Sequence, residues 1–290
     1  MLQAKGMRGF VGKVCMDTNS PGFYCESSTE TSLKETREFI QHLKDTKSSV
    51  TPVITPRFAP TCTSALMHGL GNISQELGVP IQTHLSENRE EISWVRSLFP
   101  EFSSYAQVYE KHGLLTDKTV LAHCVHVTDP ELELIKKQGS GISHCPNSNT
   151  SLVSGAMPTR KIFDKGIKLG LGTDVAGGYS CSIFNAIREC IGVSKLRYAT
   201  IDHNDDQSAP ITLAEAFWMA TRGGAELFSL EKQIGVLEPG WEFDALLLDT
   251  ENLDVFVGED ESLEDLFEKA IYTVTHHDIQ QIWIKGNKVY

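Results

Sequence analysis

The stretch that decides the fold is VPIQTHLSEN, residues 79–88, an apolar strand-like run that ends in His84 and Glu87. Two later apolar runs repeat the arrangement: TVLAHCVH carries His123, and IKLGLGTDVAGG carries Asp174. In a parallel α/β barrel the carboxyl ends of the strands converge on one face, where active sites are built. The pattern therefore predicts that these polar side chains, far apart in the sequence, belong to one site.

The sequence up to Asp174 repeats a strand-then-helix pattern. Runs rich in β-branched residues predict strands at Phe10–Asp17, Val50–Pro56, Pro80–Glu87, Val120–His126, Gly141–Cys145 and Lys168–Asp174. Apolar residues at intervals of three and four predict helices at Thr31–Leu43, Cys62–Leu77, Asn88–Phe99, Pro130–Gln138 and Pro158–Lys165. Such units indicate parallel strands joined by helical crossovers. The expected fold class is α/β, an incomplete (β/α)8 TIM-type barrel with about six of its eight strands.

The character of the sequence changes near residue 230. Before that point two more helices are expected, at Ser182–Arg197 and Thr212–Leu227. After it, GVLEPGWEFDALLLD and QQIWIKGNKVY are typical of short strands with glycine turns. We therefore expect two domains. Residues 1–230 form the barrel, with its first strands missing, and residues 231–290 form the C-terminal portion of a small β-sandwich domain and the closing segments.

The composition is that of an ordinary soluble protein. The 290 residues are 40% hydrophobic and 22% charged, which is enough apolar material for a sizeable core. The formal net charge of −12 argues against nucleic acid or an anionic membrane as the main partner. The cysteines form no C-x-x-C pair, and the sequence shows no signal-type leader and no apolar run of about 20 residues. These features favour a cytoplasmic (cytosolic) location.

The polar residues at the strand ends suit metal-assisted hydrolysis. Imidazole nitrogen and carboxylate oxygen are ligands that zinc prefers, and an open coordination position would hold the attacking water. Arg57, directly after an expected strand, adds a cation. Each residue alone also has a structural explanation: Asp174 can start a turn before Gly177, and Glu87 can open the next helix. The joint pattern is what favours a site.

Competing catalytic motifs do not occur in this sequence. It contains no G-x-S-x-G, P-loop or H-E-x-x-H motif and no cytidine-deaminase pattern. Cys145 has no assigned base beside it, so a catalytic thiol is not expected. No His-x-His pair occurs upstream of His84. His126 lies three residues past His123 on the same expected strand, so it should face the other side of the sheet.

Seven segments resemble, in order, those of the metal-dependent amidohydrolase superfamily and, within it, the guanine deaminase family. They are FVGKVCMD (10–17), TPRF (55–58), THLSEN (83–88), LAHC (121–124), SHCPNSN (143–149), LGTDVAGG (171–178) and EFDALLLD (242–249). THLSE and GTD mark only the superfamily, whereas TPRF, HCPNSN and GTDVAGGYS together point to the purine enzymes. The resemblance covers nearly the whole chain.

The resemblance implies zinc-dependent hydrolytic deamination of guanine to xanthine and ammonia, a step of guanine catabolism and purine salvage. By motif position, His84 and Asp174 would be ligands of one Zn²⁺ per subunit. Glu87 would shuttle a proton to a ring nitrogen, and His123 would polarise the reacting centre. Asp174 would also take the proton of the attacking water, as a carboxylate beside both metal and water can.

The same resemblance implies which residues contact the substrate. They are Arg57, Phe58, His84, Glu87 and Asp174. Arg57 would hydrogen-bond the carbonyl side of the purine, and Phe58 would pack beside the base. The family further implies a homodimer. Its small-molecule substrate would be guanine, and neither nucleic acid nor a membrane would be a partner.

The sequence departs from the family pattern at its start. The family begins with small-domain strands and a first barrel strand that ends in His-x-His, whereas this chain resembles it from the third barrel strand onward. Two usual histidine ligands are therefore absent from these 290 residues. Two alternatives stay open: a catalytically inactive truncated isoform that associates with full-length subunits, or another heterocycle deaminase or chlorohydrolase of the same superfamily.

Overall fold

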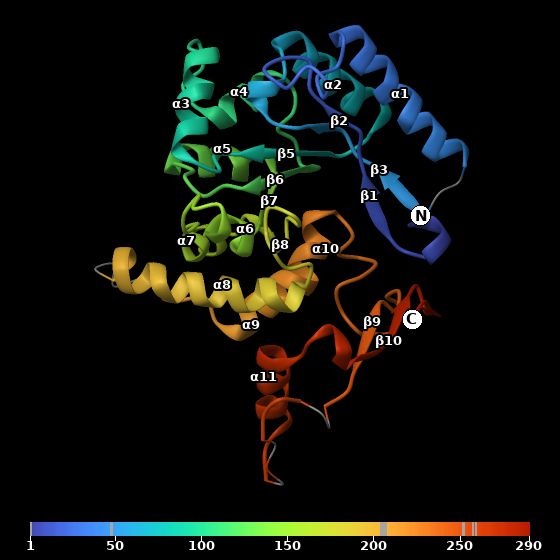
Figure 1. The fold of residues 1–290 in the computed structure, drawn as a ribbon, viewed down its shortest axis with the longest axis vertical. Helices are drawn as coiled ribbons and strands as arrows, with labels where there is room; N and C mark the ends of the chain where they lie inside the picture. The colour runs from blue at the N-terminus through green and yellow to red at the C-terminus, as the bar shows by residue number, and fades with distance from the viewer. Residues whose placement is uncertain (1, 47–48, 204–207, 251–252, 257, 259) are drawn as a thin grey trace. The chain divides into compact units, whose positions relative to one another are not determined.

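The computed structural model describes residues 2–46, 49–203, 208–250, 253–256, 258 and 260–290 (Figure 1). The chain divides into two compact units. The first comprises Met1–His144 and Ile162–Leu169, and the second comprises Cys145–Lys161 and Gly170–Tyr290. A domain boundary near residue 230 stays a prediction.

Parallel strands run through the first unit. Their bounds are β1 (Gly9–Val11), β2 (Val14–Cys15), β3 (Val50–Pro52), β4 (Thr55–Pro56), β5 (Ile81–Leu85), β6 (Thr119–His123), β7 (Gly141–His144) and β8 (Lys168–Leu171), whose second half belongs to the other unit. β1 pairs with β3 and β2 with β4, and β5, β6, β7 and β8 form a sheet in that order. β1 with β3, β2 with β4, β5 with β6 and β6 with β7 all pair in parallel, so the expected α/β class is confirmed.

Several expected strands end earlier than predicted. The run Phe10–Asp17 contains the two short strands β1 and β2, and Val50–Pro56 contains β3 and β4. β6 stops at His123 instead of His126 because His123 and Cys124 have φ values of 70° and 51°, outside the extended region. β8 likewise stops at Leu171, three residues before Asp174. His84 and His123 therefore lie at the ends of β5 and β6, whereas Glu87 and Asp174 lie in the segments that follow β5 and β8.

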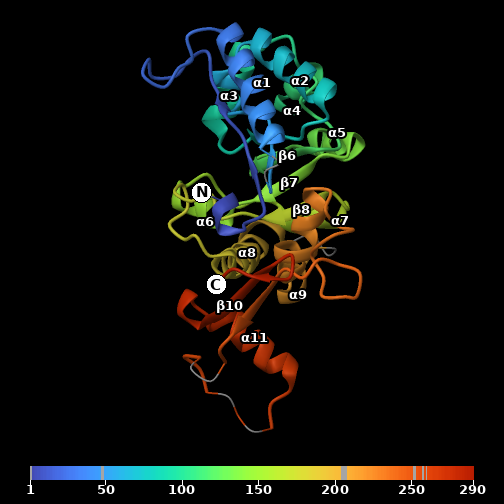
Figure 2. The ribbon, with the colours of Figure 1, turned by 90° about the vertical axis from the view of Figure 1, so that its right-hand side faces the viewer.

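The helices of the first unit match the expected ones closely, with one addition. They are α1 (Thr29–Asp45), α2 (Ser64–Leu77), α3 (Arg89–Leu98), α4 (Tyr105–Lys111) and α5 (Asp129–Gln138). α1 and α2 pack side by side (Figure 2). The side chains of Ser28, Thr63, Asn88 and Ser104 each accept a hydrogen bond from the backbone N–H three residues later, which caps α1 to α4. α4 was not expected, because seven residues show little periodicity.

Helices dominate the second unit. They are α6 (Pro146–Ser151), α7 (Thr159–Asp164, which runs into the first unit), α8 (Ile183–Arg197), α9 (Leu213–Trp218), α10 (Gly224–Leu227) and α11 (Leu263–Thr273). The single helix expected at Thr212–Leu227 is interrupted by a π-helical turn at Met219–Gly223. The C-terminal strands β9 (Ala245–Leu248), β10 (Ile279–Ile284) and β11 (Asn287–Lys288) pair in antiparallel fashion.

α11, which lies between β9 and β10 in sequence, was not expected. Its end is held by Arg188 of α8, which donates from Nε to the carbonyl of Ile271 at 2.7 Å and from Nη2 to that of Val274 at 2.5 Å. Arg188 thereby satisfies carbonyls that a helix end leaves without intrahelical donors. Leu253, Ala270 and Val274 form a buried cluster beside it. Across the described residues, no helix combines the length and apolar character needed to cross a membrane.

Close packing of α2 gives a test of the fold. A Cβ at Gly71 would lie 2.2 Å from the carbonyl oxygen of His112, and this neighbour is backbone. We expect Gly71→Ala to lower the free energy of unfolding by about 1–3 kcal/mol, as overpacking does. A Cβ at Gly192 in α8 would meet nothing within 4 Å, so Gly192→Ala should raise that free energy by up to about 1 kcal/mol. Urea unfolding measures both, and equal effects would contradict the packing.

Candidate active site

β5 brings His84 to the site. Along this strand Ile81, Thr83 and Leu85 are buried, whereas Gln82 and His84 alternate with them and are only half-buried. This is the period of a pleated strand, in which successive side chains point to opposite faces. The side chain of His84 therefore lies on the opposite face of β5 from the buried ones.

A hydrogen bond determines which ring nitrogen of His84 carries the proton. Nδ1 lies 2.7 Å from the main-chain carbonyl oxygen of Arg57, and a carbonyl can only accept. The proton is therefore on Nδ1, and Nε2 is the acceptor nitrogen. Metal-binding histidines characteristically use this arrangement, donating one ring N–H to a backbone carbonyl or carboxylate while the other nitrogen binds.

Arg57 contributes to the site through both its main chain and its side chain. Its carbonyl also accepts from the His84 N–H at 3.3 Å and from the Thr83 hydroxyl at 3.2 Å. Its exposed guanidinium lies 5.5 Å from the centre of the Phe58 ring. Phe58 in turn meets His84 edge-on, with ring centres 6.5 Å apart. A cation thus lies beside the Phe58 ring, and that ring contacts the His84 imidazole.

His123 and Glu87 complete the cluster in the first unit. The His123 ring stacks on the His84 ring with centres 5.2 Å apart and planes inclined by 24°. Nε2 of His123 lies 3.8 Å from a Glu87 carboxylate oxygen. The His123 side chain is almost fully buried and that of Glu87 is 18% exposed. The structure thus brings five of the six predicted site residues together: Arg57, Phe58, His84, Glu87 and His123.

A hollow of about 370 Å³ adjoins this cluster. Its lining includes Phe58, Glu87 and Trp94, and the rings of Phe58 and Trp94 meet edge-on at 6.1 Å. Pockets of roughly this size, with aromatic walls and a few polar groups, are typical of small-molecule sites. The hollow thus combines two aromatic rings with the carboxylates of Glu87, Glu90 and Glu91.

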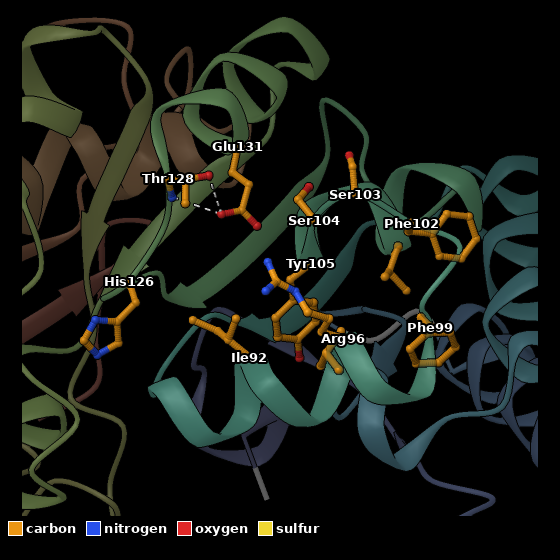
Figure 3. A pocket seen from close by; sticks show the side chains of 12 residues that line it. Ile92, Arg96, Phe99, Phe102, Ser103, Ser104, Tyr105, His126, Thr128 and Glu131 are labelled. Atoms are coloured by element: carbon orange, nitrogen blue, oxygen red, sulfur yellow. Dashed lines mark hydrogen bonds between the residues drawn. The ribbon is translucent and has the colours of Figure 1, made fainter.

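His144, at the end of β7, and His126, after β6, also lie near strand ends, but neither is one of the five clustered residues. Burial, with a smaller contribution from the nearby His123, lowers the pKa of His144 to about 3, so His144 is a neutral imidazole at physiological pH. His126 was expected on the far face of the β6 strand, which is wrong because the strand ends before it. It lines a separate pocket of about 110 Å³ together with Arg96 and Glu131 (Figure 3).

Asp174 lies in the second unit, in the turn after β8. One of its carboxylate oxygens accepts from the Ser148 hydroxyl at 2.6 Å, and its main-chain carbonyl accepts from the Gly178 N–H at 2.8 Å. Its φ is 44°, a left-handed conformation that aspartate tolerates better than most residues. Ser148 thus orients the carboxylate.

Ser148 and its neighbour Asn147 support the Asp174 loop, a role that was not expected. The Asn147 side-chain oxygen accepts from the Tyr179 N–H at 2.8 Å. The HCPNSN segment therefore holds both ends of the loop that carries Asp174. Both segments were recognised as family motifs, but nothing in their sequence shows that one supports the other.

The donors fit zinc in type. His84 has the tautomer of a metal ligand, and Asp174 offers an oriented carboxylate. Within the part of the chain that the structure describes, no group of three or more His, Cys, Asp and Glu side chains is arranged to hold a metal ion. His84 in the first unit and Asp174 in the second are therefore suitable zinc donors in type, each described within its own unit.

Comparisons with known proteins agree with this chemistry. The amidohydrolase family model matches residues 2–289. A guanine deaminase of Dictyostelium discoideum is 44% identical over the whole chain, which spans 64% of that protein. The crystal structure of a guanine deaminase from C. acetobutylicum with bound guanine superposes with a TM-score of 0.92 at 39% identity, covering all of this chain and 67% of the other.

A more distant structure, an adenosine deaminase from Xanthomonas campestris with bound zinc, has a TM-score of 0.84 at 23% identity, covering 99% of this chain and 62% of the other. At that identity the likeness shows the shared fold alone. The family model and the closer structure together identify the chain. It belongs to the amidohydrolase family and is similar to the guanine deaminases within it.

Proposed function

We propose that this chain carries the guanine-binding and proton-transfer residues of a zinc-dependent guanine deaminase, which hydrolyses guanine to xanthine and ammonia. The observation that carries the proposal is the cluster of His84, His123 and Glu87 beside Arg57 and Phe58. The similarity of the chain to a solved guanine deaminase with bound guanine supports the proposal.

Each residue has a role that its surroundings support. Arg57 donates to the carbonyl oxygen of guanine, while Phe58 packs against the purine, as a guanidinium beside an aromatic ring can. Glu87 carries a proton from the attacking water to a ring nitrogen. Buried His123, 3.8 Å from Glu87, donates toward the oxygen that develops charge. Asp174, oriented by Ser148, accepts the other proton of the water and passes it to the amino group, which leaves as ammonia.

Zinc enters the proposal through His84 and Asp174. A zinc ion held there would be the Lewis acid that makes water nucleophilic at neutral pH. Catalytic zinc usually has at least three protein ligands, so these two residues form part of its ligand set. One Zn²⁺ per subunit, a homodimer and a cytosolic location stay predictions.

The direct test is turnover. The 290-residue chain, purified and supplied with zinc, should consume guanine, followed as loss of guanine absorbance. His84→Ala should abolish turnover, because it removes the ring that joins the Arg57 carbonyl to the cluster. His42→Ala, on an exposed face of α1, should leave it unchanged. A folded, zinc-loaded wild-type chain without turnover would contradict the proposal.

Substrate recognition has its own test. We expect Arg57→Ala to weaken guanine binding roughly 10- to 100-fold, the effect of losing a charged hydrogen bond. Zinc content should not change, since the His84 bond is to the Arg57 main chain. Arg96→Ala, in the separate pocket, is the matched control. Unchanged guanine affinity in Arg57→Ala, with turnover of another heterocycle in a substrate panel, would reassign the substrate.

The proton-transfer role of Glu87 can be separated from binding. Glu87→Gln keeps the shape and hydrogen-bonding capacity of the side chain but cannot carry a proton. We expect kcat to fall by about 10²–10⁴-fold, the usual size of a general acid–base contribution, with a much smaller change in KM. Steady-state kinetics measure both. A kcat within twofold of wild type would remove Glu87 from the mechanism.

A further inference from the structure

A buried carboxylate on α3 holds the main chain of Glu87. One oxygen of Glu91 accepts from the Glu87 N–H at 2.9 Å and from the Asn88 N–H at 3.3 Å. The Asn88 side chain in turn accepts from the Glu91 N–H at 2.8 Å, which closes a capping box at the start of α3. The segment that carries Glu87 is thus tied to the helix by a charged acceptor.

The other oxygen of Glu91 has a separate partner. It accepts from the hydroxyl of Tyr105 at 2.9 Å, and both side chains are buried, with exposures of 6% and 3%. Burial raises the pKa of Glu91, whereas the hydrogen bonds from Tyr105, Asn88 and Glu87 oppose that rise by stabilising the carboxylate. Tyr105 therefore orients the carboxylate and fixes which oxygen faces the Glu87 segment.

The same aromatic pair reaches the strand that carries His84. The Tyr109 hydroxyl lies 3.3 Å from that of Tyr105 and donates to the main-chain carbonyl of His84 at 2.7 Å. It accepts from the Ala59 N–H at 3.0 Å. Because Ala59 follows Phe58 in sequence, a single buried hydroxyl ties together the two backbone segments that carry Arg57, Phe58 and His84.

We propose that Glu91, held by Tyr105, is a positioning residue that sets the location of Glu87 relative to His123. Tyr109 likewise positions the end of β5, which carries His84. The catalytic part of this inference rests on the proposed function. Glu91 also lines the hollow beside Glu87. The hydrogen bonds of Glu91 to Glu87 and of Tyr109 to His84 run to main-chain groups, so the proposed effect passes through the main chain of these site residues.

The same unit contains a matched comparison. Glu131 closes a capping box at the start of α5, with one oxygen accepting from the Thr128 N–H at 3.0 Å and hydroxyl at 2.9 Å (Figure 3). Its other oxygen accepts from the Ala106 N–H at 3.2 Å. Its exposure is 5%, close to that of Glu91. Glu131 therefore has the same chemistry and burial but holds no proposed site residue.

The experiment compares Glu91→Ala, Glu91→Gln and Tyr105→Phe with Glu131→Ala in the 290-residue chain. Amide hydrogen exchange should speed up about tenfold at Glu87 and Asn88 in Glu91→Ala, while the amides of α2 stay protected. With guanine and zinc, kcat should fall about tenfold or more while KM changes less. Glu91→Gln should recover part of both losses, because its amide oxygen can still accept.

Glu131→Ala is expected to speed exchange at Thr128 and Ala106 and to keep kcat within about twofold. Tyr105→Phe is a milder change and serves if Glu91→Ala does not fold. It should also speed exchange at Glu87 and Asn88 and lower kcat. Unchanged exchange at Glu87 and Asn88, or an equal loss of kcat in Glu131→Ala, would overturn the inference. If the wild-type chain shows no turnover, the proposed function fails, whereas the exchange rates still decide whether Glu91 holds the Glu87 segment.

Discussion

The hydrogen bond from Nδ1 of His84 to the main-chain carbonyl of Arg57 is the contact on which the candidate site depends. It joins the end of β5 to the segment after β4, and these two meet only because the strands run parallel, as the bridge between Ile54 and Ile81 shows. The bond orients the imidazole that stacks on His123. It also selects the tautomer, and so decides which nitrogen can bind a metal or accept a proton.

Hydrogen bonds at the starts of helices hold the other residues of the candidate site. A helix start needs acceptors for its first N–H groups, and Glu91 meets that need at α3 while it holds the segment carrying Glu87. At β8 the turn after the strand carries Asp174, and the Ser148 hydroxyl at α6 orients it. Groups that would be needed for folding in any α/β protein therefore also set the geometry of the residues that we assign to the chemistry.

The sequence predicted well which polar residues follow the apolar strand runs, but it predicted the exact strand bounds and the supporting contacts poorly. His84, Glu87 and His123 could be found because each follows an apolar run, and parallel topology brings such ends together. Tyr105 and Tyr109 could not, since their helix is short and buried aromatic residues read as ordinary core. The extent of β6 was misjudged because positive φ angles at His123 and Cys124 leave no trace in hydrophobic periodicity. Long-range pairs such as Ser148 with Asp174 are invisible to local patterns.

The main-chain carbonyl and the side chain of Arg57 have separate contacts, and this separation has an evolutionary consequence. Its carbonyl holds His84, and every amino acid has that group, whereas its guanidinium faces outward beside Phe58. Replacing the side chain leaves the carbonyl in place, provided that the backbone keeps its path. On the substrate-binding role that we propose for Arg57, single mutations at this position can therefore change substrate preference without disrupting the histidine pair, and relatives that share the scaffold can diverge toward other heterocycles.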